Sequence, residues 1–186
     1  SHTGRRYLQI YTNRLLEVTM RIREIVLVGL LSAATTAGKL VLSFIPNVEI
    51  VTLFFIIFAT TLGLKRSLLI TVVFVTTEIL IYGFSTWVIG YYLVWPLLVL
   101  IVCALSKNIS SEYGYAVIGS LFGFFYGMFF AVTESFFYGL AYGFAYWING
   151  LTFDLVHGAS NFVIVLLLYK PLKKMMDIQV AKLQTY

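Results

Sequence analysis

Residues 87–105 read WVIGYYLVWPLLVLIVCAL and contain no charged side chain. A bilayer-spanning helix needs about 20 consecutive apolar residues, so this stretch is long enough to cross the hydrocarbon core. It ends at Ser106-Lys107, where charge returns to the chain. The stretch therefore predicts a membrane-spanning helix, and the sequence on both sides repeats the same pattern.

The whole chain is as apolar as this stretch suggests. Of its 186 residues, 60% are hydrophobic and only 11% are charged, whereas soluble domains carry about 25% charged residues. The sequence therefore predicts an all-α polytopic membrane protein, with one membrane domain at residues 20–174 that forms a six-transmembrane-helix bundle. We expect the six spans at residues 24–44, 49–64, 67–82, 87–105, 113–138 and 149–169.

The basic residues predict an orientation. If the six runs are spans, every one of the 13 Lys and Arg residues except Lys39 falls on the same side of the membrane. Cytoplasmic loops of membrane proteins are enriched in Lys and Arg. We therefore expect both termini on the cytoplasmic side of a bacterial cell membrane.

The two ends of the chain differ from the apolar domain. Residues 1–19 are polar and precede Met20, so we interpret them as an added or upstream extension. Residues 175–186 mix apolar side chains with polar and charged ones, which predicts a cytoplasmic amphipathic tail.

Motifs for catalysis and metal binding are absent from the sequence. It has no Gly-rich phosphate loop with a Lys-Ser/Thr ending, no H-E-x-x-H motif and no paired cysteines, since Cys103 is the only cysteine. We therefore expect no catalytic residues, no cofactor and no metal, and we expect the chain not to be an enzyme.

Ionisable residues inside the apolar runs are the first functional candidates, because a charged group at membrane depth costs about 2.5–3.5 kcal/mol on insertion scales. Lys39 is expected to form an intramembrane ion pair, with either Glu78 or Glu134 as its partner. Asp154, His157 and Asn161 follow i, i+3, i+7 spacing, which places them on one helix face. They either bind a polar solute that enters from outside or hold the helices together.

Aromatic residues gather in the predicted outer connections. Trp87 and Tyr91 begin one span, and residues 138–150 mix aromatics with glycines. These rings either form an interfacial belt or stack on a flat ligand ring, with residues 138–150 as a lid. Asn47 either caps the second span or contacts the ligand. The predicted substrate-binding residues are Asn47, Glu49, Trp87, Tyr91, Asn149, Asp154, His157 and Asn161.

Small residues recur every four positions in the first span, at Gly29, Ala33 and Ala37. This spacing allows close helix packing in a membrane. The stripe serves either packing within this chain or the docking of a partner helix.

Three sequence segments, taken together, resemble the substrate-binding S component of an energy-coupling factor (ECF) vitamin transporter. They are Ala33-Ala34-Thr35-Thr36-Ala37; Phe44-Ile45-Pro46-Asn47-Val48-Glu49 with Val51-Thr52; and Tyr82-Gly83-Phe84 to Trp87 with Tyr91 to Trp95-Pro96. The last two are similar to a branch of S components from Gram-positive bacteria, and the resemblance covers residues 20–174.

The resemblance implies a function and partners. S components bind a vitamin from outside, dock through the span-one stripe onto a membrane coupling protein that carries two ABC-type ATPases, and topple to deliver the vitamin. It implies Ala33 and Ala37 as docking residues and the first outer connection as a gate. The substrate implied is of the pyridoxine or hydroxymethylpyrimidine type, or cobalamin. The alternatives are a small intramembrane enzyme with His157 and Asp154 as an acid–base pair, and a membrane adaptor without a ligand.

Overall fold

The structure, a computed structural model, describes the backbone of residues 2–46 and 48–185 and the side chains of residues 22–46 and 48–182. The described residues form helices joined by short connections, without a strand among them. The elements are α1 (His2–Leu42), α2 (Val51–Leu62), α3 (Leu64–Tyr82), α4 (Thr86–Leu105), the 3-10 helix η1 (Ser106–Asn108), α5 (Glu112–Phe124), α6 (Tyr126–Tyr138) and α7 (Leu140–Thr185).

Four helical segments are long and apolar enough to cross a membrane. They are Ile22–Leu42, Thr86–Asn108, Glu112–Tyr138 and Leu140–Lys182. The remaining two differ for physical reasons: α2 has only 12 residues, and α3 carries Lys65, Arg66 and Glu78. The chain is therefore all-helical with four candidate spans.

The predicted starts of the first and third spans differ from the starts of α1 and α3 in the structure. α1 is continuous from His2, so the backbone shows no break between the polar residues 2–19 and the first span. α3 begins at Leu64, which places Lys65 and Arg66 in its first turn rather than in a loop. Gly63 alone joins α2 to α3, with a positive φ of 77° that glycine adopts without strain.

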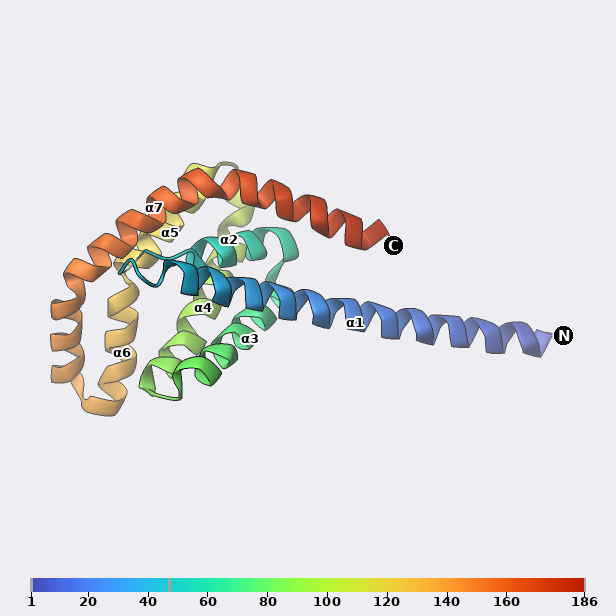
Figure 1. Ribbon diagram of the computed structural model, residues 1–186, viewed down its shortest axis with the longest axis horizontal. Coiled ribbons are helices and arrows are strands. Elements are labelled where there is room, and N and C mark those ends of the chain that lie inside the picture. The colour runs from blue at the N-terminus through green and yellow to red at the C-terminus, as the bar shows by residue number, and fades with distance from the viewer. Residues whose placement is uncertain (1, 47, 186) are drawn as a thin grey trace.

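The prediction of an aromatic loop at residues 138–150 is wrong. Gly139, with a φ of 89°, is the whole connection between α6 and α7. The aromatic residues after it belong to the first turns of α7, and α6 and α7 form an antiparallel hairpin (Figure 1). α7 also continues through Pro171, well past the expected end at residue 169, and residues 175–185 extend the same helix.

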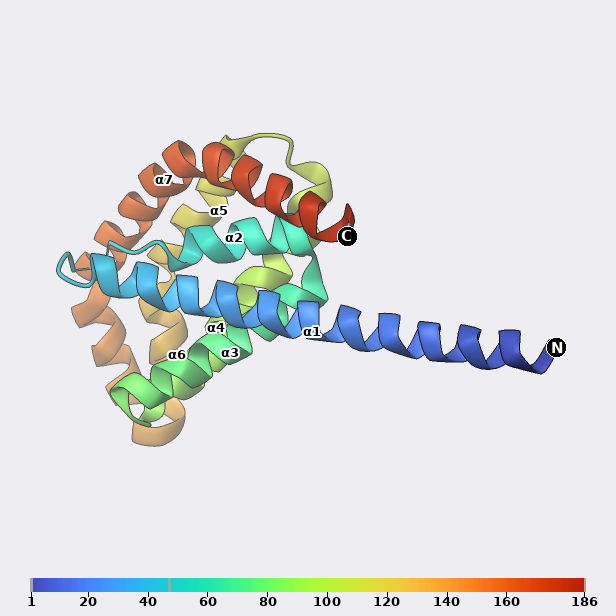
Figure 2. The ribbon, with the colours of Figure 1, turned by 45° about the vertical axis from the view of Figure 1, so that its right-hand side comes forward.

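The helices do not all follow one axis. α1 lies crosswise to α6 and to the first part of α7 in two views (Figures 1 and 2). α7 curves as it rises, and its C-terminal part returns alongside α2. Two hydrogen bonds join α2 to this C-terminal part of α7: Thr61 Oγ1 donates to Asp177 Oδ1 at 3.1 Å, and Tyr169 Oη donates to Thr60 Oγ1 at 3.3 Å.

The core is an aromatic cluster between α2, α3 and α4. The rings of Phe55 and Phe74 lie 5.7 Å apart, and the Phe55 and Trp95 rings lie 5.3 Å apart. All three side chains are buried. Edge-to-face and tilted ring contacts of this kind add to the free energy of simple burial, and they fix α2 and α4 in place beside the site described below.

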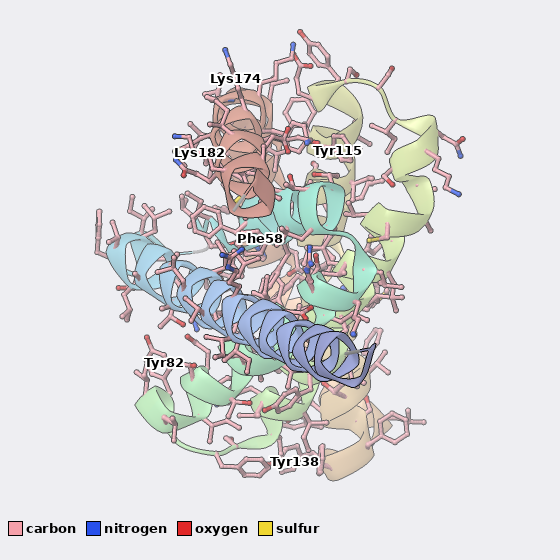
Figure 3. All side chains as sticks on the ribbon, turned by 90° about the vertical axis from the view of Figure 1, so that its right-hand side faces the viewer. Phe58, Tyr82, Tyr115, Tyr138, Lys174 and Lys182 are labelled. Atoms are coloured by element: carbon pink, nitrogen blue, oxygen red, sulfur yellow. The ribbon has the colours of Figure 1, made fainter. Side chains whose placement is uncertain are left out.

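Apart from Lys39, the described basic side chains belong to α1, the first turn of α3, η1 and the C-terminal part of α7. Glu24 Oε1 lies 3.5 Å from Arg66 Nε, and Glu112 Oε1 lies 2.6 Å from Lys170 Nζ. Figure 3 shows Lys174 and Lys182 at the opposite end from Tyr82 and Tyr138. The structure therefore separates a basic end from an end at which the α3–α4 and α6–α7 connections lie.

Much of the remaining surface is apolar. Leu80, Phe136 and Leu140 are almost fully exposed, and large apolar side chains are exposed along α1, α3, α6 and α7. Monomeric soluble proteins rarely expose contiguous apolar patches of more than a few hundred Å². Together with the four long apolar helices, this surface indicates a membrane protein.

Candidate functional site

The predicted polar face of α7, formed by Asp154, His157 and Asn161, is directed to the interior. Asp154, His157 and Asn161 are 6%, 5% and 1% exposed. Each contacts a different neighbour: Asp154 reaches α6, His157 reaches the connection between α1 and α2, and Asn161 reaches α2 and α5. The i, i+3, i+7 spacing therefore identified a buried face, and the three groups also hold separate elements together.

Asp154 occupies the break between α5 and α6. The helix is interrupted at Phe125, whose φ of −99° and ψ of 4° leave the helical region, so α6 begins with backbone N–H groups that lack helical acceptors. Asp154 Oδ1 accepts a hydrogen bond from the Gly127 N–H at 2.9 Å. A carboxylate at a helix N-terminus also interacts favourably with the helix dipole. Asp154 thus caps α6 from a distant part of the chain.

Gly127 makes this contact possible because it has no side chain. A Cβ at residue 127 would lie 2.5 Å from Asp154 Oδ2 and 2.7 Å from Oδ1. The second oxygen, Oδ2, is buried and has no hydrogen-bond partner among the described residues. A buried polar atom without a partner is costly, so Oδ2 is a candidate acceptor for a ligand.

Glu49 and His157 form the second polar contact of the site. His157 Nε2 lies 3.2 Å from Glu49 Oε1, and Glu49 Oε2 accepts a hydrogen bond from the Thr52 N–H at 2.9 Å in the first turn of α2. Burial alone would raise the pKa of Glu49, but the hydrogen bonds from His157 and Thr52 outweigh it and lower that pKa. The Glu49 carboxylate therefore fixes both the start of α2 and the ring of His157.

Asn161 lies deeper in the core. Its Nδ2 donates to Thr52 Oγ1 at 3.3 Å and to the Gly119 carbonyl at 3.4 Å. It lines neither of the cavities described next. Its contacts join α7 to α2 and α5, which matches the helix-stabilising alternative for this residue.

The larger of two adjoining cavities lies between α4, α6 and the first part of α7. Its volume is about 650 Å³, within the range of small-molecule sites. Its lining residues are mostly aromatic and come from α4, from α6 directly after the α5–α6 break, and from α7. They are Trp87, Tyr91, Tyr126, Gly127, Phe130, Tyr142, Ala145, Tyr146, Asn149, Gly150, Phe153 and Asp154.

A smaller cavity of about 310 Å³ adjoins it, beneath the α1–α2 connection. Tyr91 and Tyr126 line both cavities and form the wall between them. The smaller cavity also contains Lys39, Glu49 and His157. Tyr126 packs on the His157 ring, with centroids 4.7 Å apart. His157, which lines the smaller cavity, therefore supports the Tyr126 ring in this wall.

Lys39 pairs with Glu78, which decides between the two expected partners. The Lys39 ammonium and the Glu78 carboxylate are in direct contact, and Glu78 is fully buried. The Lys39 Nζ also lies 4.9 Å from the Tyr82 ring centroid and 5.2 Å from that of Tyr91. Glu134 is buried on α6 but forms no ion pair with Lys39 among the described side chains.

The structure brings most of the predicted binding residues together. Trp87, Tyr91, Asn149 and Asp154 line the larger cavity, and Glu49 and His157 line the smaller one, whereas Asn47 lies outside the described residues.

The docking stripe of Gly29, Ala33 and Ala37 is exposed, whereas α1 buries an adjacent face, formed by Val28, Ser32, Thr35 and Thr36. Packing of the stripe within this chain is therefore excluded for these three residues.

Sequence reasoning missed Tyr126, Gly127 and Phe130. They lie within one uninterrupted apolar run, which contains no proline to signal the break at Phe125. The glycines at 119, 123 and 127 are a signal that could have found them. At Gly123, an added Cβ would lie 2.7 Å from the Gly158 backbone nitrogen, so this spacing marks the face on which α7 packs.

No family model, curated protein or solved structure matches this chain.

Proposed function

We propose that this chain is the substrate-binding subunit of an ECF-type importer, which captures a water-soluble vitamin outside the cell and delivers it to a membrane coupling protein driven by two ABC-type ATPases. The observation that carries the proposal is the aromatic cavity of about 650 Å³ with the unpartnered Asp154 Oδ2 in its lining. Flat aromatic walls and a few polar groups are the usual features of a site for a small ring compound.

The position of the cavity supports capture from outside. The cavity lies on the first turns of α7, near the end that carries the α3–α4 and α6–α7 connections and away from the basic end. Under the positive-inside rule the basic end is cytoplasmic. In the proposed arrangement, α2 and α3 complete a six-helix bundle with both termini in the cytoplasm.

The cavity size favours one substrate class over another. A volume of about 650 Å³ suits a single substituted ring such as pyridoxine or hydroxymethylpyrimidine. Cobalamin is a corrinoid of much greater size, and it would need both cavities and an opening of the Tyr91–Tyr126 wall. The smaller ring compounds are therefore the preferred ligands.

The exposed face of α1 supports docking onto a membrane partner. Gly29, Ala33 and Ala37 leave this face without bulk, and no atom lies within 4 Å of a Cβ placed at Gly29. Small residues allow close approach of another helix in lipid. In the proposal this face receives the coupling protein, and bulky side chains at Ala33 and Ala37 abolish transport while vitamin binding persists.

Among the alternatives, the enzyme has less support than capture. An acid–base pair would require His157 and Asp154 to act together, but His157 contacts Glu49 and Asp154 contacts Gly127. The adaptor without a ligand leaves the lined cavity and its unpartnered acceptor unexplained.

Binding of vitamins by the purified protein tests the proposal. Calorimetric titration of the detergent-solubilised chain with pyridoxine, hydroxymethylpyrimidine and cobalamin is expected to show saturable binding of a ring compound. Trp87→Ala and Asn149→Ala are expected to weaken it at least about tenfold, because both line the cavity. Absence of binding for every vitamin in a full panel would contradict the proposal.

A further inference from the structure

We propose that the ligand of the larger cavity carries a positive charge on or beside its ring. This inference rests on the proposed capture function and narrows its substrate class. The cavity combines three features that suit an organic cation: an uncompensated carboxylate, aromatic faces on several sides and a lining without basic groups.

The charge balance of the cavity is the first support. Asp154 is the only Asp or Glu residue in the lining, and no Lys, Arg or His residue joins it there among the described residues. Nearby, Lys39 is paired with Glu78, and Glu49 lies within hydrogen-bond distance of His157. Glu134, buried on α6, adds a further carboxylate rather than a cation. A cationic ligand would supply the counter-charge that Asp154 lacks, and a buried charge is stable only when it is paired.

The aromatic walls are the second support. The quadrupole of an aromatic ring attracts a cation placed over its face, and cages of such rings bind organic ammonium groups. Tyr91, Tyr126, Phe130 and Tyr146 reach this cavity from three helices. The same wall already holds one cation, because Lys39 Nζ lies 5.2 Å from the Tyr91 centroid on the side of the smaller cavity.

The acceptor geometry is the third support. Oδ1 of Asp154 is committed to the Gly127 N–H, whereas Oδ2 has no partner among the described residues. A cation without donors, such as an N-methylated ring, would interact with the carboxylate through its charge, and one with an N–H would also donate to Oδ2. An anionic ring would meet uncompensated repulsion from Asp154.

A pair of ring compounds that differ in charge tests the inference. The cation 1-methylnicotinamide and the neutral nicotinamide are titrated into the purified protein, with tryptophan fluorescence and calorimetry as readouts. The cation is expected to bind at least about tenfold more tightly, as a desolvated cation–aromatic contact and a charge pair allow. Equal affinities, or no binding of the cation, would overturn the inference.

Asp154→Asn assigns the preference to the carboxylate. Asparagine keeps an oxygen that accepts the Gly127 N–H, so the α6 cap is retained while the charge is removed. The variant is expected to lose at least tenfold in affinity for 1-methylnicotinamide and less than threefold for nicotinamide. The matched control is Asp177→Asn, which removes the same charge from the same helix outside the cavity and is expected to change neither affinity. A preference that persists in Asp154→Asn would overturn the inference.

Pyridoxine, hydroxymethylpyrimidine and the full vitamin panel, titrated in parallel, separate this inference from the proposed function. If a neutral vitamin binds and Asp154→Asn leaves its affinity unchanged, the charge preference is wrong and the capture function stands. If no vitamin and neither probe binds, both fail.

Discussion

At the scale of single residues, the site depends on carboxylates that each have a different structural partner. Asp154 caps α6, Glu49 fixes the start of α2, and Glu78 neutralises Lys39. In each case the carboxylate accepts from a group on another element or at a helix start. The polar residues thus position the aromatic walls as well as lining the cavities.

The Glu49 contacts predict a pH dependence of stability. Because its pKa is lower in the folded protein than the ordinary value of 4.5, Glu49 contributes stability that is complete above that ordinary value and is lost as the pH falls through the folded value. We expect the melting temperature in detergent to fall below about pH 4.5, and to fall less steeply in Glu49→Gln. Parallel curves for the two proteins would contradict this assignment.

The Lys39–Glu78 pair predicts a non-additive pair of substitutions. Lys39→Met leaves the Glu78 carboxylate buried without a partner, and breaking such a pair costs about 3 kcal/mol. The double variant Lys39→Met, Glu78→Met removes both charges and is expected to recover most of that loss. Chemical unfolding in detergent measures both. If the double variant is as unstable as Lys39→Met, or less stable than it, the two side chains do not stabilise each other.

At the scale of secondary-structure elements, the glycines on α5 determine how closely α7 approaches. A Cβ at Gly123 would lie 2.7 Å from the Gly158 nitrogen and 2.8 Å from its Cα. Backbone atoms of two packed helices cannot yield as a flexible side chain can. The seam between α5 and α7 therefore depends on both glycines.

Gly123→Ala and Gly29→Ala form a matched test of this seam. Both glycines are helical, but a Cβ at Gly29 has nothing within 4 Å. Gly123→Ala is expected to destabilise the protein by about 1–3 kcal/mol through overpacking. Gly29→Ala is expected to be neutral or to stabilise by up to about 1 kcal/mol, because alanine favours helix. Similar effects on the free energy of unfolding would show that the seam is not tightly packed.

The hairpin of α6 and α7 changes how access to the cavity is understood. The aromatic residues after Gly139 belong to a continuous helix rather than to a mobile loop. In the connection between α1 and α2, the described residues 43–46 form a turn and residues 48–50 are irregular, and residues 48 and 49 line the smaller cavity. Within the proposed function, this connection is the better candidate for a gate.

At the scale of the whole molecule, orientation in the membrane is the property that the proposed function needs most. α2, with 12 residues, extends about 18 Å at 1.5 Å per residue, which is less than the hydrocarbon thickness of about 30 Å. In the proposed six-helix arrangement, a crossing by α2 would depend on burial against neighbouring helices, and α2 is largely buried.

Cysteine labelling of intact cells measures this orientation. In a Cys103→Ser background, single cysteines replace Ser43, Lys65, Ser85 and Lys107. A membrane-impermeant maleimide is expected to label positions 43 and 85 and to leave positions 65 and 107 unlabelled until the cells are opened. Labelling of 43 and 65 from the same side would show that α2 does not cross, and the inverse pattern would reverse the proposed orientation.

The sequence alone determined the features that depend on local chemistry. The apolar length of residues 87–105 predicted α4 almost to its ends, because burial of apolar residues in lipid needs only the residues of that segment. The i, i+3, i+7 spacing placed Asp154, His157 and Asn161 on one buried helix face, because this spacing too depends only on residues of a single helix. The candidates for Lys39 were also correct, although the choice between Glu78 and Glu134 stayed open.

Only the tertiary structure decided which of these groups meet. Glu49 and His157 are 108 positions apart in the sequence. Asp154 can bind the Gly127 N–H because the helix is interrupted at Phe125, within a continuous apolar run of sequence. Such contacts depend on how whole helices pack, which local hydropathy and spacing do not encode. The physical reason is that any apolar helix is stable in lipid, so hydrophobicity does not determine which helices pack together. The close packing of small residues and the pairing of buried charges determine it instead.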